Sequence, residues 1–569
     1  MYYYKVVHFL FVMSNKGFII SIKDQIIITT GLFDCFVGEL VNIVDYNSLV
    51  QGQGLVMNLE SDIVRLVLIK GLQKNIKSGY KVLRTFNAAT TRCGYSTLGT
   101  LLSPLGDFLN SFDFSDATLA KKNLMHSFFN KVNCKAPSII ERSTVRFPLF
   151  TGIAMIDCFL PIGRGQRELI IGDINTGKTT LALTIVLNQR ISINKINYIW
   201  RAIESTTNHF RKHSRFMPCI YILIGKRRSE LLRIKYILVA QNAFNYTCIV
   251  FSGCDELAAL QYVAPYAGTT IGEWFRTQGY HALVIYDDLS EHAVAYRQLS
   301  LLLRRPPGRE AYPGDIFYIH SSLLERSGQL KRTVGNGSVT SFPLIETKGG
   351  DITSYIPTNV ISITDGQIFL SKTLVNKNIR PSIDLTVSVS RIGSKAQYTC
   401  LKFVCKKVRS IYATFKTFEN VAKVTSDLDP VTELYINRGL SIIQFLNQPL
   451  YHTYTLYNEV LGFFLLSEGY LDGIKTKYVN LFFNLLFKAY FAKYYLEEHK
   501  HLLKYIIHDN CSIVESLLKM YSVEPFLTDW HVIGKQYNNF FKNELQLLLV
   551  SGTFDHKQLY TITKPSIWA

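Results

Sequence analysis

A glycine-rich loop that could bind phosphate is the strongest chemical signal in the sequence. Residues 172–179 read Gly-Asp-Ile-Asn-Thr-Gly-Lys-Thr, and they follow an apolar run and precede a helix-like stretch. In this context the backbone N–H groups of the loop point at phosphate oxygens, and the start of the helix adds partial positive charge. We expect Lys178 to reach the outer phosphates of a nucleotide and the Thr179 hydroxyl to bind Mg²⁺. The other predicted contacts of the loop are Gly172, Asn175, Thr176, Gly177 and Thr180.

A carboxylate that could complete the metal site follows a second apolar run. Residues 282–286 are apolar or aromatic, and Asp287 and Asp288 come directly after them. A carboxylate at the end of a buried strand can hold Mg²⁺, often through a water molecule. The alternative is a pair of aspartates that caps the next helix. Both can hold, with Asp287 on the metal side and Asp288 in the turn.

Changes of pattern divide the chain into the elements that would position these residues. Short β-branched runs separated by glycine and polar turns predict a small β-barrel over residues 17–83. Apolar runs that alternate with helical stretches predict a P-loop α/β domain with a mostly parallel sheet over 84–396. The pattern becomes helical over 397–520. Residues 1–16 and 521–569 remain as an N-terminal segment and a C-terminal extension.

The composition is that of a folded protein with a large core. The chain has 569 residues, of which 48% are hydrophobic and 18% charged, whereas a disordered chain is more charged and less apolar. Its ten cysteines form no Cys-x-x-Cys pair, which favours buried thiols in a reducing compartment over a metal or disulfide role. The apolar stretch at 479–496 is interrupted and bounded by charges, so we interpret it as a packed helix and not as a membrane span.

The formal net charge of +19 raises the question of a nucleic-acid or anionic-lipid partner. The chain has no long Lys/Arg block and no aromatic-basic RNA motif, so we interpret the charge as spread over solvated faces. Such a surface suits a nucleotide ligand and acidic neighbouring subunits. We therefore predict no nucleic-acid partner.

Several longer motifs resemble the α subunit of F-type, proton-transporting ATP synthases. The resemblance rests on residues 163–168, on 287–315, which contain Arg-Arg-Pro-Pro-Gly-Arg-Glu-Ala-Tyr-Pro-Gly-Asp, and on 355–367. Residues 381–390 begin Pro-Ser-Ile-Asp and are similar to the signature that rotary ATPase α and β subunits share. The resemblance extends from about Ile19 to Leu518 and is densest in the middle.

This resemblance implies a multidomain fold with an N-terminal β-barrel, a central RecA-like α/β nucleotide-binding domain and a C-terminal α-helical domain. It implies that α alternates with β subunits in a hexameric ring around a central-stalk subunit, and that peripheral-stalk subunits also contact the ring. Membrane association would be through the proton-channel sector only. The α subunit would bind Mg-ATP or Mg-ADP without turnover, while the catalytic sites for ATP synthesis lie on β, at an interface with α.

The resemblance also assigns roles to single residues. Arg391 matches the arginine finger that α extends into the catalytic site of β, where a permanent positive charge would stabilise the transferring phosphoryl oxygens. The alternative for an arginine in such a turn is a surface salt bridge. The other nucleotide contacts that the resemblance implies are Glu346 near the phosphates, Arg380 and Pro381 in the pocket, and Gln448 near the adenine. The sequence departs from the family's usual residues at Ile174, Asn175 and Leu450, and also at Lys226, where familiar α subunits have a glutamine.

Lys226 bears on whether the site hydrolyses nucleotide. Hydrolysis needs a carboxylate that orients and polarises the attacking water. In the related catalytic subunits a Glu occupies the strand-end position that Lys226 matches, and a charged lysine cannot accept a proton. We therefore expect no hydrolysis at this chain's own site, whether Lys226 faces the γ-phosphate or solvent.

Three rival interpretations are a catalytic β-type subunit, an RNA-translocating hexameric helicase and a nucleotide-binding scaffold without a role in turnover. Lys226 and the α-type motif at 305–310 argue against the first. The match to a C-terminal helical domain argues against the second. Mutation of Arg391 separates the third from the α-subunit interpretation.

Residue usage suggests where the protein is made. Tyr, Phe, Ile, Asn and Lys are abundant and have AT-rich codons, and residues 1–13 lack the character of an import peptide. We therefore predict an organelle-encoded protein on the matrix side of the mitochondrial inner membrane. The basic stretch at 191–217 is interpreted as a surface insertion. The extension at 521–569 either contacts a further subunit or folds back on its own domain.

Overall fold

The computed structural model describes most of the chain up to residue 483. The described ranges are 16–32, 34–109, 128–189, 217–422, 429–469, 471–472, 476–480 and 482–483. The predicted segment before residue 16, nearly all of the predicted insertion and the whole C-terminal extension lie outside these ranges.

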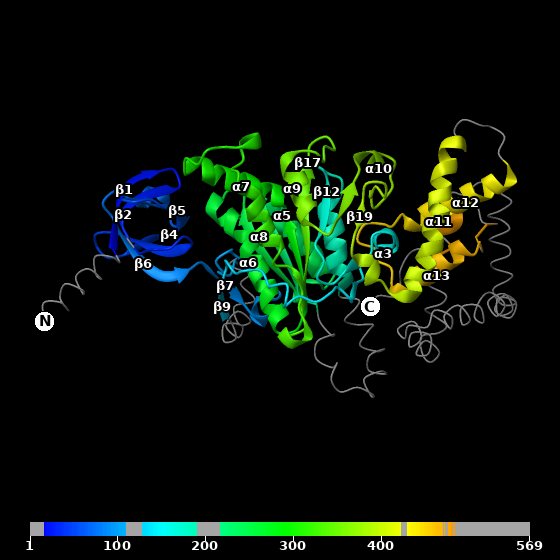
Figure 1. The fold of residues 1–569 in the computed structure, drawn as a ribbon, viewed down its shortest axis with the longest axis horizontal. Coiled ribbons are helices and arrows are strands. Elements are labelled where there is room, and N and C mark those ends of the chain that lie inside the picture. The colour runs from blue at the N-terminus through cyan, green and yellow to red at the C-terminus, as the bar shows by residue number, and fades with distance from the viewer. Residues whose placement is uncertain are drawn as a thin grey trace. The chain divides into compact units, whose positions relative to one another are not determined.

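Six antiparallel strands close into a barrel at the start of the described chain (Figure 1). Inward-facing apolar side chains such as Val41, Val56 and Leu66 are fully buried in its interior. The barrel predicted from the sequence is therefore confirmed. In the order in which they pair, its strands are β1 (Lys16–Lys23), β2 (Ile26–Gly31), β5 (Val64–Lys70), β4 (Val50–Leu59), β3 (Glu39–Val44) and β6 (Lys81–Ala88).

A nine-stranded sheet forms the centre of the nucleotide-binding domain. Six of its pairings are parallel, and only the short strands β16 and β19 pair antiparallel. The central strands are buried almost throughout, as expected of a sheet covered on both faces. In spatial order the strands are β19 (Val389–Ser390), β18 (Gly366–Leu370), β12 (Glu168–Asp173), β17 (Ser338–Thr347), β15 (His281–Asp287), β13 (Cys219–Lys226), β14 (Thr247–Gly253) and β8 (Leu101–Leu102), with β16 (Gly328–Gln329) on β17.

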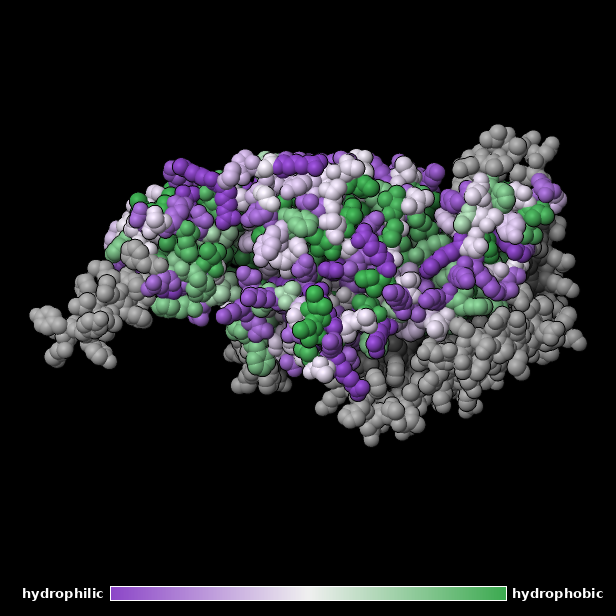
Figure 2. Space-filling view, viewed as in Figure 1, coloured by the Kyte–Doolittle hydropathy of each residue, from purple (hydrophilic) through white to green (hydrophobic). Residues whose placement is uncertain are grey.

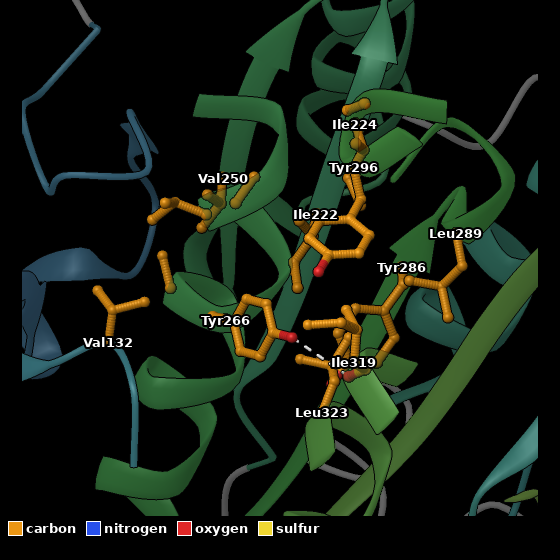
Figure 3. Packing of buried hydrophobic residues seen from close by; sticks show 14 of the residues in the cluster. Val132, Ile222, Ile224, Val250, Tyr266, Tyr286, Leu289, Tyr296, Ile319 and Leu323 are labelled. Atoms are coloured by element: carbon orange, nitrogen blue, oxygen red, sulfur yellow. Dashed lines mark hydrogen bonds between the residues drawn. The ribbon is translucent and has the colours of Figure 1, made fainter. Parts of the chain in front are cut away.

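Helices pack on this sheet and complete the largest apolar core of the described chain. Helix α6 (Ala258–Thr277) approaches β13 closely at Gly268, where an added Cβ would lie 2.3 Å from Cδ1 of Ile222. In Figure 3 Ile222 and Tyr266 lie in this core, and the Tyr266 hydroxyl donates to the carbonyl oxygen of Ile319 at 3.2 Å. The other helices of the domain are α3 (Ala154–Phe159), α5 (Arg228–Ala240), α7 (Leu289–Leu302), α8 (Ile316–Leu324), α9 (Tyr355–Ile363), α10 (Lys372–Asn376) and a helix over 178–189.

Short strands and 3-10 helices link the larger elements. The short strands pair as β7 (Thr90–Cys93) with β9 (Phe128–Lys131) and β10 (Pro148–Leu149) with β11 (Ile162–Gly163). The 3-10 helices are η1 (Gln73–Asn75), η2 (Tyr95–Thr97), η4 (Phe244–Tyr246), η5 (Arg309–Ala311), η6 (Arg332–Val334), η7 (Gly393–Lys395) and η8 (Thr476–Tyr478). On the face shown in Figure 2, hydrophilic and hydrophobic residues are interspersed.

The described chain after the sheet is helical, as the sequence predicts. Its helices are α11 (Thr399–Ala422), α12 (Pro430–Leu446) and α13 (Leu456–Ser467). Aromatic rings join them, because Phe445 of α12 lies 5.2 Å from Phe463 of α13, measured between ring centroids. No helix in the described ranges is both long and apolar enough to cross a bilayer.

Candidate nucleotide-binding site

The phosphate-binding loop lies between the end of β12 and the helix over 178–189, at the carboxyl edge of the parallel sheet. Two residues of the loop have positive φ, Asn175 at 63° and Gly177 at 98°. Asparagine and glycine tolerate this left-handed conformation best, which explains their place in the loop. The carboxyl edge of a parallel sheet is where ligands of such folds bind. The predicted strand–loop–helix context is therefore confirmed.

The Lys178 ammonium is held against its own loop. Its Nζ donates to the carbonyl oxygens of Gly172 at 2.8 Å and Asp173 at 2.7 Å, and it lies 3.9 Å from Oε2 of Glu346 on β17. Burial lowers the pKa of Lys178, and the Glu346 carboxylate opposes that shift. Lys178 and Glu346, which were predicted from separate parts of the sequence, are thus brought together at the phosphate end of the loop.

Thr179 and Asp287 also meet, although 108 positions separate them in sequence. The Thr179 hydroxyl donates to Oδ2 of Asp287 at 3.0 Å, and the Tyr221 hydroxyl donates to the same oxygen at 2.8 Å. Burial raises the pKa of Asp287, whereas the nearby Lys226 lowers it. A hydroxyl and a carboxylate are hard oxygen ligands of the kind Mg²⁺ prefers, so these two residues fit a magnesium site.

Tyr221 was missed by sequence analysis. Its hydroxyl reaches Asp287 because β13 pairs in parallel with β15, where Leu223 is the partner of Asp287. Burial and the adjacent Asp287 raise the pKa of Tyr221, so it remains a hydrogen-bond donor. A tyrosine in an apolar run carries no local signal of this role, because the role depends on which strands are neighbours.

Lys226 points at the two aspartates. Its Nζ lies 3.0 Å from Oδ2 of Asp288 and 3.7 Å from Oδ1 of Asp287. Oδ1 of Asp288 accepts from the backbone N–H of Glu291 at 2.8 Å, which caps helix α7. Asp288 therefore caps the helix, as one of the two alternatives predicts, while Asp287 lies beside Thr179 at the loop and its metal role stays a prediction. Lys226 does not point to solvent.

The loop is braced from two sides by residues that sequence analysis did not assign. The Asp173 carboxylate accepts from the Thr347 hydroxyl at 2.6 Å and from the backbone N–H of Gly350 at 2.7 Å. These hydrogen bonds, the one from Thr347 above all, lower the pKa of Asp173. On the other side the Ser382 hydroxyl donates to the carbonyl oxygen of Thr176 at 2.9 Å. The loop geometry is therefore fixed by β17 and by the segment after α10.

The residues predicted near the base lie together, but the Gln448 side chain binds protein backbone. The backbone N–H of Gln448 donates to the carbonyl oxygen of Arg380 at 2.8 Å, next to Pro381. Its side-chain amide donates to the carbonyl oxygen of Gly152 at 3.0 Å and accepts from the N–H of Ala154 at 2.9 Å. Direct contact of this amide with a base would require a change of partner. Leu450, by contrast, is 54% exposed.

Arg391 is exposed and lies between the sheet and the helical region. It follows β19 directly, and its Nη1 donates to the carbonyl oxygen of Thr364 at 3.5 Å. No carboxylate in the described ranges lies within 4.0 Å of its guanidinium, so the surface salt bridge considered as an alternative is not formed.

These features define a class: a P-loop nucleotide-binding subunit with a β-barrel before the loop domain and helices after it. Residues 152–390 match the ATP synthase alpha/beta family, nucleotide-binding domain, and 397–518 match the ATP synthase alpha/beta chain, C terminal domain. ATP synthase subunit alpha of Neorickettsia sennetsu is 43% identical over 80% of this chain and 84% of its own length. ATP synthase subunit alpha of Rickettsia canadensis is 41% identical over 83% and 86%. The chain belongs to the F-type ATP synthase α-subunit family.

Membership of the α-subunit family confirms several expectations from the sequence and contradicts the expected location. The chain is part of the ATP synthase enzyme complex, binds ATP or ADP, and assembles with β subunits in the catalytic head. The predicted mitochondrial inner-membrane location and organelle-encoded origin are wrong. These relatives come from bacteria, which points to a bacterial, plasma-membrane-associated enzyme.

Proposed function

We propose that this chain binds Mg-ATP or Mg-ADP at a non-catalytic site and supplies Arg391 to the catalytic site of the neighbouring β subunit. The observation that carries the first part is the ammonium of Lys226, which lies beside Asp287 and Asp288 where a hydrolytic site needs an available carboxylate. A charged lysine cannot accept a proton from water. The chain would therefore hold a nucleotide without consuming it.

The two aspartates are also unsuited to act as a base. Oδ2 of Asp287 already accepts two hydrogen bonds, from Thr179 and Tyr221. In Asp288, Oδ1 caps helix α7 and Oδ2 accepts from Lys226. A carboxylate whose oxygens are all engaged cannot orient an attacking water without losing a partner. Hydrolysis by this site would need a rearrangement of the strand ends.

Binding of the nucleotide would use the remaining groups. The Lys178 ammonium would exchange its loop carbonyls for phosphate oxygens, and the backbone N–H groups from Gly172 to Thr180 would surround the phosphates, with Asn175, Thr176 and Gly177 at the turn. Thr179 and Asp287 would hold Mg²⁺, which when bound neutralises phosphate charge. Arg380, Pro381 and Gln448 would border the base.

Arg391 supports the second part of the proposal. Its backbone N–H donates to the carbonyl oxygen of Asp365 at 3.0 Å, so the turn is fixed while the guanidinium remains exposed. A planar, permanently charged group on a fixed turn suits charge stabilisation across an interface. We also propose central-stalk and peripheral-stalk partners, membrane association through the proton-channel sector only, and no nucleic-acid partner.

The test is the Arg391→Ala variant in the complex purified through this chain. We expect β and stalk subunits to remain in stoichiometric amounts, and ATP hydrolysis to fall by about 10³-fold or more, the effect of losing such a finger in related phosphoryl-transfer systems. Lys395→Ala, which removes an exposed charge from the next turn, is the control and should hydrolyse normally. Normal hydrolysis by an assembled Arg391→Ala complex would refute the finger. Purification of this chain with RNA and without β would refute the whole assignment.

A further inference from the structure

The lysine at the end of β13 is directed onto two buried carboxylates. Its side chain is 21% exposed, whereas those of Asp287 and Asp288 are 3% and 2% exposed. Although burial opposes the charged form of Lys226, the adjacent Asp288 and Asp287 raise its pKa. Removal of one charge from a buried pair leaves the other uncompensated, so the three groups form one unit.

The backbone conformation at the end of β13 directs the Lys226 side chain toward the two aspartates. The register between β13 and β14 shifts between Ile224 and Lys226, and Gly225 between them has a φ of 65°. A bulge at the end of a strand re-aims the next side chain. An added Cβ at Gly225 would come within 3.1 Å of Cβ of Glu291, so the position has neither the conformation nor the space for a larger residue.

Lys226 faces the two carboxylate oxygens that no other group in the described ranges engages. Oδ2 of Asp287 takes the two hydroxyl donors and Oδ1 of Asp288 takes the helix cap. The other oxygens, Oδ1 of Asp287 and Oδ2 of Asp288, lie within 3.7 Å of the ammonium. These are the oxygens by which the pair would bind a metal ion or the water around it. With Lys178 also present, one net negative charge is left among two lysines and the carboxylates of Asp287, Asp288 and Glu346.

We infer that Lys226 is a built-in counter-cation, so that this site binds metal-free ATP and ADP nearly as tightly as their Mg²⁺ complexes. The inference rests on the proposed non-catalytic site and states which forms of the nucleotide that site accepts. Mg²⁺ would approach carboxylates that already have a positive partner, and the ammonium would repel it. A polyphosphate without Mg²⁺ would gain from the second ammonium beside Lys178. Each effect is electrostatic and strong in a half-buried site.

The experiment compares ATP binding to the full chain in excess Mg²⁺ and in EDTA by calorimetry. For the wild type we expect the two dissociation constants to agree within about threefold. For Lys226→Gln we expect binding in EDTA to be at least about tenfold weaker than in Mg²⁺, a difference of about 1.4 kcal/mol. Lys226→Met, which keeps the length of the side chain without its charge, should behave like Lys226→Gln. Lys74→Gln removes the same charge from an exposed position in the barrel and should keep the wild-type ratio.

Each outcome decides the inference. A wild-type chain that loses more than about threefold in affinity without Mg²⁺, or Lys226 variants that keep the wild-type ratio, would overturn it, while the proposed non-catalytic binding would stand. This comparison needs no variant, so it remains decisive if the substitutions impair folding. If the wild type binds ATP in neither condition, the proposed function fails and the inference falls with it. If the two wild-type dissociation constants agree, and both Lys226 variants bind ATP at least about tenfold more weakly in EDTA than in Mg²⁺, Lys226 is established as the counter-cation.

Discussion

At the scale of the residue, two buried tyrosines on adjacent strands differ in whether the partner of their hydroxyl is charged, and the charge of the partner determines how much a hydrogen bond contributes to stability. Tyr221 donates to the Asp287 carboxylate at 2.8 Å, whereas the Tyr286 hydroxyl pairs with the Thr269 hydroxyl at 2.9 Å. Both tyrosine side chains are fully buried. Hydrogen bonds to charged groups contribute about 1.5–3 kcal/mol and neutral ones about 0.5–1.5 kcal/mol.

The Tyr221→Phe variant should therefore lose about 1.5–3 kcal/mol in the free energy of unfolding, because the buried Asp287 keeps its charge with one donor fewer. Tyr286→Phe, with a neutral partner, should lose about half as much. Urea unfolding of the nucleotide-free chain, followed by a signal from the central domain, measures both. Equal losses would mean that the charge of Asp287 is not what Tyr221 stabilises.

The site residues that could be predicted are those whose role is written in a local motif. Lys178 and Thr179 belong to the loop, and Asp287 ends an apolar run, so spacing and strand position were sufficient. Tyr221 and Thr347 could not be found this way, because their roles depend on the order of strands in the sheet. Lys226 was singled out, but its pairing with the aspartates required the three-dimensional structure.

At the scale of the element, the barrel contains a buried charged pair that joins β3 to β6. Glu39 at the start of β3 accepts from Nε of Arg84 on β6 at 3.0 Å and from Nη2 at 3.1 Å. The two side chains are 0% and 6% exposed. Glu39 also accepts from the backbone N–H groups of Phe36 and Phe86, so the carboxylate ties the turn before β3 to β6.

Arg84→Met should destabilise the barrel by about 3–5 kcal/mol, because it leaves the Glu39 carboxylate buried without its cation. Adding Glu39→Gln to that variant should restore part of the loss. Lys70→Met breaks the exposed pair with Asp107 and should cost no more than about 1 kcal/mol. Hydrogen exchange of the barrel amides compares the three variants. Protection in Arg84→Met equal to that in Lys70→Met would show that the buried ion pair does not stabilise the barrel.

The elements were predicted better than their arrangement. Buried apolar runs indicated parallel strands, and the structure confirms them, but no pattern in a single run states that β12 lies between β18 and β17. The two-residue strands β8 and β19 are too short to give a periodic signal. They are defined by their neighbours, which is why a sequence pattern cannot find them.

At the scale of the whole molecule, residue usage did not identify the compartment. Amino-acid bias reports the base composition of a gene, and bacteria and organelles can share that bias. The correction came from relatives in bacteria that align over four fifths of this chain. The loop domain also contacts the C-terminal helices, and there the Gln448 side chain is hydrogen-bonded to the backbone around α3.

Two buried carboxyl groups lie at that contact. Asp157 of α3 is 4% exposed and accepts from the backbone N–H of Gly152 at 2.8 Å, and Glu459 of α13 is fully buried. Burial raises the pKa of Asp157 to about 7, against the lowering effect of its backbone donors. Burial and the nearby Asp157 also raise the pKa of Glu459. The buried Cys405 thiol also acts on Glu459, and the phenols of Tyr398 and Tyr454 interact with Asp157 and Glu459, respectively.

This pair should make the docking of the helical region depend on pH. A carboxyl whose pKa is raised from 3.8 to about 7 binds a proton in the folded chain that the unfolded chain has already lost. Its contribution to stability is complete below about pH 4 and is lost as the pH rises to about 7, by up to about 1.4 kcal/mol per pH unit for each proton.

Asp157→Asn does not titrate, so the stability of the wild type relative to this variant should fall between pH 5 and pH 7. Urea unfolding of both proteins without nucleotide measures the difference. Parallel pH profiles would mean that Asp157 is not the carboxyl group that holds the proton. Glu459→Gln would then be the variant to compare. A protonated Glu459 beside an ionised Asp157 would also make the stability of the wild type fall as the pH rises.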